Sequence, residues 1–297
     1  MPYAAPSPDA LGALAALVAG GEVFVLTGAG LSTDSGIPDY RGRDGVRRVM
    51  PMQFGEFVGS SSARRRYWAR SFVGWQRFRA AEPNDGHHAV TALQELGLVR
   101  ALVTQNVDGL HQRAGSDRVI ELHGSLGQVV CLICGDRTAR AVVQDRLGEA
   151  NPGFADHVLA EPGGSRVSSQ IRPDGDIVLA DDLVDAFRPP RCGVCGADTL
   201  KPDVVFFGES VPRERVDACF AALEASRAVL VLGSSLAVMS GYRFVRRAAA
   251  RGIPVGVVTR GATRGDAEAS VRLDAPLTPT LARLVAEVGL RSGAGPR

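Results

Sequence analysis

The chain has 297 residues, of which 45% are hydrophobic and 22% are charged, and its formal net charge is +2. This length can bury the core of one large domain, and the balanced charge gives no reason to expect a nucleic-acid or membrane partner. No apolar run approaches the roughly 20 residues that cross a bilayer.

The first expected element is a helix that ends before residue 21. Ser7 is a suitable N-cap with Pro8 in the first helical position, and Gly20-Gly21 is a typical stop. No Arg or Lys precedes Arg41, so we expect neither a signal peptide nor a mitochondrial presequence. Because four of the five cysteines form two close pairs, we expect metal binding in a reducing compartment, and hence a cytoplasmic protein.

A glycine turn follows the first expected strand. Residues 23–27 read VFVLT, an apolar β-favouring run, and Gly28-Ala29-Gly30 follows directly. Such a turn brings backbone N–H groups close to a phosphate. The dinucleotide fingerprint also requires a glycine at position 33 and an acidic residue about 20 positions further on. Thr33 and the stretch RRVMP at 47–51 stand there instead. A phosphate cradle and a plain strand-to-helix turn are therefore about equally supported by this stretch alone.

Residues 43–82 combine arginine with aromatic side chains at three- and four-residue spacing. This pattern is typical of an amphipathic helix. Arginine beside aromatics also suits single-stranded nucleic acid. The balanced net charge instead favours a small helical module with an apolar interior and an arginine-studded exterior.

Short apolar strands and amphipathic helices alternate in the rest of the chain. We expect helices at 85–96, 213–225, 241–251 and 279–288, a short helix within 105–114, and strands at 99–104, 119–122, 203–207, 228–233 and 254–259. This alternation predicts an α/β fold, a Rossmann-type parallel sheet with helices on both faces. The segments 43–82 and 129–201 interrupt it, and we expect the tail 291–297 to be disordered.

Two cysteine pairs predict a zinc module. Cys131 and Cys134 form one pair, Cys192 and Cys195 form the other, and a glycine follows each pair. Two such knuckles provide four thiolates for a closed, tetrahedral, structural zinc site, and four unconnected buried thiols are a poor alternative at this spacing. The 57 residues between the pairs (135–191) require an insertion, whose loop we place at 152–172. Cys219 is interpreted as a small apolar core residue.

Three polar residues come soon after expected strands. Asn106 and Asp108 follow the strand at 99–104, and His123 follows the strand at 119–122. Ligands bind at this carboxyl edge of open α/β sheets. The three residues together, opposite the glycine turn, therefore favour catalysis over a structural role. The histidines expected on the surface or on helices are His87, His88 and His157.

Taken together, the motifs resemble the sirtuins, a family of NAD-dependent protein deacylases. They are GAGLSTDSGIPDYRG from position 28, TQNVDGLH from 104, ELHG from 121, the two cysteine pairs, KPDVVFFGE from 201 and VLGSSLAV from 231. The resemblance covers residues 22–290. The stretch RRRYWARSFVGWQRF at 64–78 further resembles the class II branch, which includes a mitochondrial human member and bacterial relatives.

The resemblance implies one catalytic domain with two lobes. A Rossmann lobe comprises about 1–42, 83–128 and 202–290, and a small lobe combines a helical module at 43–82 with the zinc module at 129–201. NAD, consumed as a co-substrate, and an acyl-lysine protein or peptide enter the cleft between the lobes. One structural zinc ion takes no part in the reaction.

The family's site residues are carried over by position. His123 is implied as the catalytic base, with Asn106 and Asp108 as further catalytic residues. The residues implied to contact NAD are Gly28, Ala29, Gly30, Ser32, Ile37, Pro38, Asp39, Tyr40, Arg41, Gln105, Asn106, Asp108, Gly233, Ser234, Ser235, Thr259, Arg260 and Gly261. The peptide is implied to add as a strand to a clamp formed by Val205, Phe206, Phe207, Gly208, Glu209, Ala237 and Val238.

In the implied reaction, the acyl oxygen attacks the anomeric carbon of the nicotinamide ribose as nicotinamide leaves. His123 then takes a proton from a ribose hydroxyl, so that the acyl group passes to ADP-ribose. An imidazole with a pKa near its ordinary value of about 6.5 suits this step.

Two departures from the family pattern limit what carries over. Thr259 stands where most sirtuins carry Asn, and we expect NAD binding to survive because a hydroxyl still bonds a ribose. An ungapped match places Ser71 and Gly74 where the desuccinylase branch carries Tyr and Arg, so succinyl-lysine is not the expected substrate. Protein mono-ADP-ribosylation and a non-catalytic zinc-module binding protein are the alternatives.

Overall fold

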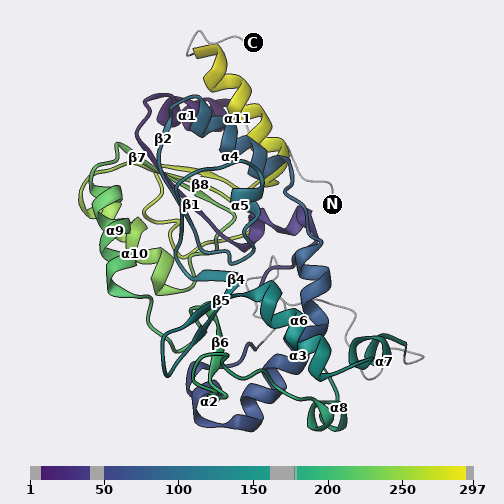
Figure 1. Ribbon diagram of the computed structural model, residues 1–297. Coiled ribbons are helices and arrows are strands. Elements are labelled where there is room, and N and C mark those ends of the chain that lie inside the picture. Colours follow the sequence, from purple (N-terminus) through teal and green to yellow (C-terminus); the bar gives the residue numbers. More distant parts are fainter. Residues whose placement is uncertain (1–7, 41–49, 161–176, 178, 292–297) are drawn as a thin grey trace.

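The computed structural model of the chain describes residues 8–40, 50–160, 177 and 179–291. Figure 1 shows a larger lobe in the upper part of the view and a smaller lobe below it. The larger lobe contains a six-stranded sheet and the smaller lobe a three-stranded sheet. Within the described residues, no helix is long and apolar enough to cross a membrane.

Six parallel strands form the larger sheet, in the order β3-β2-β1-β7-β8-β9. They are β1 (Val23–Thr27), β2 (Val99–Thr104), β3 (Val119–Glu121), β7 (Ala228–Leu232), β8 (Val255–Val258) and β9 (Val271–Leu273). The prediction of a Rossmann-type parallel sheet is therefore confirmed, although β9 was not expected. The strand order reverses at β1, where β2 lies on one side and β7 on the other. Such a switch point opens a crevice at the carboxyl ends of the strands.

Helices cover both faces of this sheet because alternate strand residues point to opposite sides. In β1, Val23 and Val25 belong to one buried apolar cluster, and Phe24 and Leu26 belong to another. The helices over the first cluster are α1 (Pro8–Ala19), α4 (Asp85–Glu95) and α11 (Leu277–Arg291), and those over the second are α9 (Arg213–Glu224) and α10 (Met239–Ala250). Figure 1 shows the two groups on opposite sides of the strands.

One expectation about a helix boundary needs correction, and one helical residue has a specific structural role. Helix α11 begins at Leu277 and includes Arg291, which we assigned to a disordered tail; residues 292–297 lie outside the described residues. His87 lies on a helix, α4, as expected, and its side chain is fully buried. It occupies the third helical position, where its Nδ1 accepts a hydrogen bond from the N–H of Asn84 at 3.3 Å. This capping contact holds the ring against the fold.

The helical module of the smaller lobe consists of α2 (Phe54–Gly59) and α3 (Ser61–Arg79). Trp68 and Phe72 of α3 are buried, as the aromatic spacing predicted. Among the described residues of this module, the prediction of an arginine-studded exterior is wrong for Arg64. Arg64 is buried, with 6% of its surface exposed, because its guanidinium finds enough acceptors inside the lobe.

An antiparallel sheet in the order β5-β4-β6 completes the smaller lobe, with β4 (Gly124–Cys131), β5 (Arg137–Ala139) and β6 (Leu200–Val204). We expected a strand at 203–207 in the alternation of the parallel sheet. The strand lies three residues earlier and pairs with β4 instead, after which the chain turns at Gly208, with a φ of 83°. The expected lobe boundaries at 128/129 and 201/202 thus fall inside strands.

Three helices lie within the predicted zinc module and were not expected. They are α6 (Arg140–Ala150), α7 (Phe154–Ala160) and α8 (Asp181–Ala186). Helix α7 occupies part of the loop that we placed at 152–172, and residues 161–172 lie outside the described residues.

Candidate functional site

A cavity of about 1030 Å³ lies at the carboxyl edge of the parallel sheet, with lining from both lobes. Its walls are the turns after β1 and β7, the loop after β2, the segment after β6, and Tyr67 of α3. All described residues implied above for catalysis, NAD or the peptide line it, except Gly28 and Gly261. Arg41 lies outside the described residues. The structure thus brings together residues as far apart in sequence as Ala29 and Arg260, a separation of 231 positions.

Two glycine turns interlock at this edge. The N–H of Gly28 donates to the carbonyl of Leu232 at 2.9 Å, and that of Gly30 donates to the carbonyl of Gly233 at 2.8 Å. A Cβ on Gly28 would lie 2.8 Å from the Cβ of Ser234, and one on Gly30 would lie 2.9 Å from the Gly233 oxygen. Only glycine allows this approach.

Thr33 stands where the dinucleotide fingerprint has its third glycine, and the local structure explains why glycine is not needed there. The usual purpose of that glycine is close packing between helix and strand. Thr33 is exposed, in a 3₁₀ turn (Thr33–Ser35), and its hydroxyl donates to the carbonyl of Gly30 at 2.9 Å. No packing demand for glycine therefore exists at this position.

A hydrogen-bond network links the glycine turn to the loop after β2. Asn106 Nδ2 donates to the Gly28 carbonyl at 3.1 Å and to Ser32 Oγ at 3.0 Å. Ser32 Oγ in turn donates to Asp108 Oδ2 at 2.7 Å, and Asp108 Oδ1 accepts the N–H of Leu110 at 3.0 Å. Burial raises the pKa of Asp108, and these hydrogen bonds to its carboxylate counteract that rise. The predicted pair Asn106 and Asp108 is thus held by α5 (Leu110–Arg113) on one side and by the turn on the other.

His123 is fixed at both ring nitrogens. Its Nδ1 lies 2.8 Å from the carbonyl oxygen of Gln105, and its Nε2 lies 2.8 Å from Ser240 Oγ. Because a carbonyl only accepts, Nδ1 carries the proton in the neutral ring, and the Nε2 lone pair accepts from the Ser240 hydroxyl. Gln105 is itself held by Ser234, whose hydroxyl donates to Oε1 at 2.5 Å.

The electrostatics of His123 differ from our expectation. We expected a pKa near 6.5, but burial lowers the pKa of His123 to about 4, and the hydrogen bond to Gln105 only partly opposes this. The ring is therefore neutral at pH 7, with its basic nitrogen directed at Ser240. Sequence reasoning missed this contact of Ser240, because a separation of 117 positions leaves no local signal.

The segment after β6, to which peptide contacts were assigned above, lines the cavity next to His123. The N–H of Val205 donates to the carbonyl of His123 at 2.8 Å. Glu209 Oε2 accepts the N–H of Phe206 at 2.8 Å and lies 3.1 Å from Lys201 Nζ. Residues 206–209 are thus held in a tight turn next to His123.

The four predicted cysteines meet at one point of the smaller lobe. The Sγ atoms of Cys131, Cys134, Cys192 and Cys195 all lie within 4.8 Å of one another. The Cys131–Cys195 and Cys134–Cys192 sulfur pairs are each 3.6 Å apart. This is too long for a disulfide. It is close to the edge of about 3.8 Å expected for a tetrahedron of sulfurs around zinc at about 2.3 Å. The donor set therefore fits the structural zinc ion that the cysteine pairs predicted.

Buried histidines are expected to make the fold sensitive to acid. Burial lowers the pKa of His87 to about 4, of His111 to about 3 and of His123 to about 4. Below a pH of about 6.5 the unfolded chain binds protons that the folded chain does not, so stability is complete above this pH and falls below it. Each histidine is expected to remove about 1.4 kcal/mol of unfolding free energy per pH unit, down to its folded pKa.

Denaturant titrations between about pH 7 and about pH 5 test this expectation. His111→Gln should show a shallower pH dependence of the unfolding free energy than the intact chain. His157→Gln is the matched control, because His157 is an exposed histidine on α7. Equal slopes of unfolding free energy against pH for His111→Gln and His157→Gln would contradict the assignment of the acid sensitivity to buried rings.

Comparison with known proteins gives consistent matches over nearly the whole chain. The family model described as "Sir2 family" matches residues 28–240. The chain is 52% identical over 290 residues to "NAD-dependent protein deacetylase 1" of Streptomyces coelicolor, which covers 97% of this chain and 91% of the relative. It is 49% identical over 284 residues to the protein of the same name in Mycobacterium avium, with 96% of each chain covered. The solved structure "Sir2-p53 peptide-NAD+" superposes with a TM-score of 0.71 at 26% identity, covering 94% of this chain and 98% of the other.

Proposed function

This chain belongs to the Sir2 family, and we propose that the cavity between its lobes is the site where it deacetylates protein lysines at the expense of NAD. The chain is an NAD-dependent protein deacetylase, the activity named for relatives at about half identity over most of its length. One observation carries the assignment to this site. The cavity brings His123 together with the interlocked glycine turns on one side and the segment 205–209 on the other.

The glycine side of the cavity fits NAD. A backbone without Cβ atoms at 28 and 30 can approach a pyrophosphate closely, and the buried polar groups of Asn106 and Asp108 lie beside it. NAD supplies an electrophilic ribose carbon and a nicotinamide leaving group. We propose that residues 28–32 hold the pyrophosphate, that Asn106 and Asp108 orient the nicotinamide end, and that Ser234 and Ser235 hold the adenosine end.

We propose His123 as the general base that takes a proton from a ribose hydroxyl. The carbonyl of Gln105 keeps the proton on Nδ1, so that Nε2 carries the lone pair. Ser240 occupies Nε2 in this structure, and a ribose hydroxyl takes its place when the substrates bind. Since the ring is neutral at pH 7, no proton has to be removed from it before it acts.

Three finer assignments are proposals as well. The sequence of α3 supports membership of the class II branch. Four thiols that meet without a disulfide support work in a reducing compartment, the cytoplasm. The pairing of β4 with β6 supports a zinc module that begins at β4 and ends at β6, with the helical module packed beside it.

Nicotinamide release tests the function. The intact chain with NAD should release nicotinamide only when an acyl-lysine peptide is present, and acetyl-, lipoyl-, glutaryl- and long-chain acyl-lysine peptides establish the preferred acyl group. No acyl-dependent release with any of these peptides would overturn the proposal. Label transferred from adenine-labelled NAD onto protein would instead favour mono-ADP-ribosylation.

Replacing Glu209 with Gln is expected to raise the KM for the peptide. Glu209 pairs with Lys201, the only lysine of the chain, and burial lowers the pKa of that lysine while the carboxylate opposes the shift. Loss of the Glu209 charge weakens the hydrogen bonds from Lys201 and from the N–H of Phe206 that fix the turn 206–209. A charged hydrogen bond contributes about 1.5 kcal/mol, so the peptide KM should rise about tenfold while the KM for NAD stays unchanged.

A surface pair provides the control for this prediction. Glu287 pairs with Arg291 at 3.6 Å on α11, and Glu287→Gln should leave both KM values unchanged. The role of Glu209 is refuted if Glu209→Gln keeps the peptide KM of the intact chain, or if it raises both KM values equally.

A further inference from the structure

We propose that Arg64 is a positioning residue that couples the four-cysteine zinc site to the peptide side of the cavity. Its guanidinium holds the second cysteine knuckle and helix α2 in one fixed arrangement. The part of this inference that concerns the peptide rests on the proposed function, whereas the part that concerns zinc retention does not.

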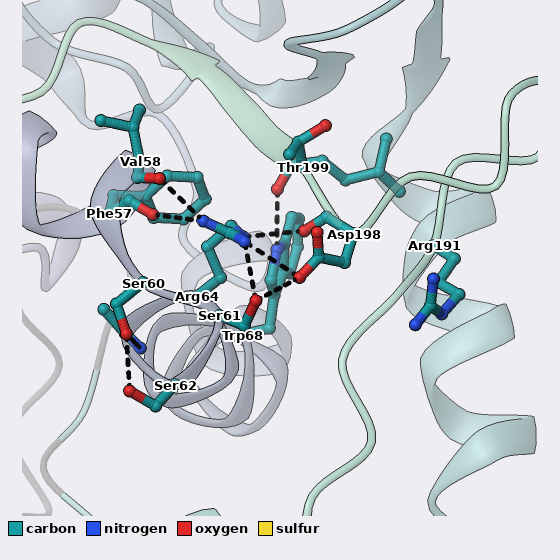
Figure 2. Close-up of polar contacts among 12 residues, drawn as sticks. Phe57, Val58, Ser60, Ser61, Ser62, Arg64, Trp68, Arg191, Asp198 and Thr199 are labelled. Atoms are coloured by element: carbon teal, nitrogen blue, oxygen red, sulfur yellow. Dashed lines mark hydrogen bonds and ion pairs between the residues drawn. The ribbon is translucent and has the colours of Figure 1, made fainter.

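Every N–H group of Arg64 has an acceptor. Nε donates to the Asp198 carbonyl at 2.9 Å, and Nη1 donates to the carbonyls of Phe57 and Val58 at 3.0 Å each. Nη2 donates to Ser61 Oγ and to Asp198 Oδ2, both at 2.9 Å. Figure 2 shows the guanidinium between the α2 carbonyls on one side and Asp198 on the other. The five N–H donors of the planar guanidinium can bind the α2 carbonyls and Asp198 at the same time, which the single ammonium group of a lysine could not do.

The Asp198 side leads directly to the zinc ligands. Asp198 lies three residues after Cys195, and the second knuckle closes through the N–H of Cys192, which donates to the Ala197 carbonyl at 2.8 Å. The neighbouring Thr199 reaches the first knuckle: its carbonyl accepts the N–H of Leu132 at 3.1 Å, and its Oγ1 lies 3.7 Å from Cys131 Sγ. The segment 197–200 therefore contacts both knuckles, the second through Ala197 and the first through Thr199.

Helix α3 clamps this segment at two points. Arg64 holds Asp198, and one helical turn later the indole Nε1 of Trp68 donates to the Leu200 carbonyl at 2.9 Å. Leu200 is also the strand partner of Cys131. Groups that orient metal ligands without binding the metal commonly change metal affinity 10- to 100-fold when removed. Arg64 contacts no cysteine itself and acts on the ligands through Asp198 and the segment that contacts both knuckles.

The α2 side leads to the peptide segment. Arg64 binds the carbonyls at the carboxyl-terminal half of α2, and the N–H of Phe54 at the start of α2 donates to the Phe207 carbonyl at 2.8 Å. The ring of Phe57 also packs edge-on against Phe206, with centroids 5.2 Å apart. Helix α2 thus spans the distance from Arg64 to the turn 206–209. Loss of Arg64 frees both the knuckle and this turn.

The test compares zinc release and kinetics in the zinc-loaded full chain. Transfer of zinc to excess chelator, followed with a chromogenic zinc indicator, should be about 10- to 100-fold faster for Arg64→Gln than for the intact chain. Arg64→Lys should restore little of the retention, because a point charge cannot bind Asp198 and the α2 carbonyls together. In the same variants the KM for the peptide should rise while the KM for NAD stays near that of the intact chain.

Arg66→Gln is the matched control. Arg66 lies on the same helix and pairs with Glu56, but its side chain is one-third exposed, so zinc release and both KM values should stay unchanged. If Arg64→Gln does not fold, Ser61→Ala provides the test instead. Ser61 is exposed, and this variant removes its hydrogen bond to Arg64 and its hydrogen bond to Asp198. Its zinc release should be about 2- to 10-fold faster.

Zinc release at the rate of the intact chain in folded Arg64→Gln, or in Ser61→Ala if Arg64→Gln does not fold, would overturn the coupling. Faster release with an unchanged peptide KM would also overturn the part that concerns the peptide. If the intact chain shows no acyl-dependent activity, the proposed function fails while the zinc result still stands, so the two failures are distinguishable.

Discussion

His123→Ala is expected to lower the rate of acyl transfer by about 10²- to 10⁴-fold, the usual contribution of a general base. Its Nε2 is the basic nitrogen that the structure aims into the cavity, and Gln105 fixes the tautomer. The dissociation constant of NAD should change little, because the glycine turn and the Asn106–Ser32–Asp108 network do not depend on the ring. Single-turnover assays of peptide deacetylation, with NAD binding measured by calorimetry, check both statements.

His88→Ala is the control for this variant, since His88 is exposed on α4 and outside the cavity. It should retain full activity and NAD binding. Unchanged deacetylation in His123→Ala would refute the assignment of the base. Loss of NAD binding in His123→Ala would show that the ring supports the cofactor side of the cavity, contrary to the proposal.

Cys134→Ser is expected to abolish zinc retention and to unfold the smaller lobe. Structural zinc contributes on the order of 10 kcal/mol to the folding of its module, and a closed site needs all four thiolates. Cys134 is exposed, so the substitution itself disturbs no packing. Zinc content and thermal unfolding, each with and without chelator, should show loss of bound metal and loss of the smaller lobe.

Cys219→Ala provides the contrast for the zinc prediction. Cys219 lies on the buried face of α9, with 0% of its surface exposed, and outside the cysteine cluster. This variant should keep one zinc ion and its chelator sensitivity, at a small cost in packing. Full zinc content in Cys134→Ser would contradict a four-cysteine site. Zinc loss in Cys219→Ala would show that this thiol supports the metal as well.

Local patterns predicted a large part of this molecule correctly. The strands β1 and β7 were readable because an apolar run of this length bounded by turn residues is typical of a buried strand. The cysteine pairs predicted the metal cluster because two residues between thiols already determine the knuckle. The residues expected at the carboxyl edge gather in one cavity because parallel strands align their carboxyl ends.

The corrections at β6, Arg64 and His123 concern contacts between distant parts of the chain. The apolar residues after Pro202 were predicted to form a further strand of the parallel sheet. They belong instead to a strand that pairs with β4, and a strand's partner depends on which other strand the fold places next to it. Arg64 looked like a surface charge, but Asp198 and the end of α2 supply its acceptors from elsewhere. The pKa of His123 near 4 follows from burial under both lobes.

The sequence by itself therefore determined five of the six parallel strands, the four-cysteine cluster and the place of Asn106, Asp108 and His123 at the cavity, because spacing and strand ends are local properties. The other cavity residues were expected from the resemblance to the sirtuins. Only the tertiary structure decided which groups are hydrogen-bonded to each other and which ionisable side chains are buried. Ser240 reaches His123 across 117 positions and Arg64 reaches Asp198 across 134. Hydrogen bonding and desolvation act over a few ångströms, and distance along the chain does not report distance in space.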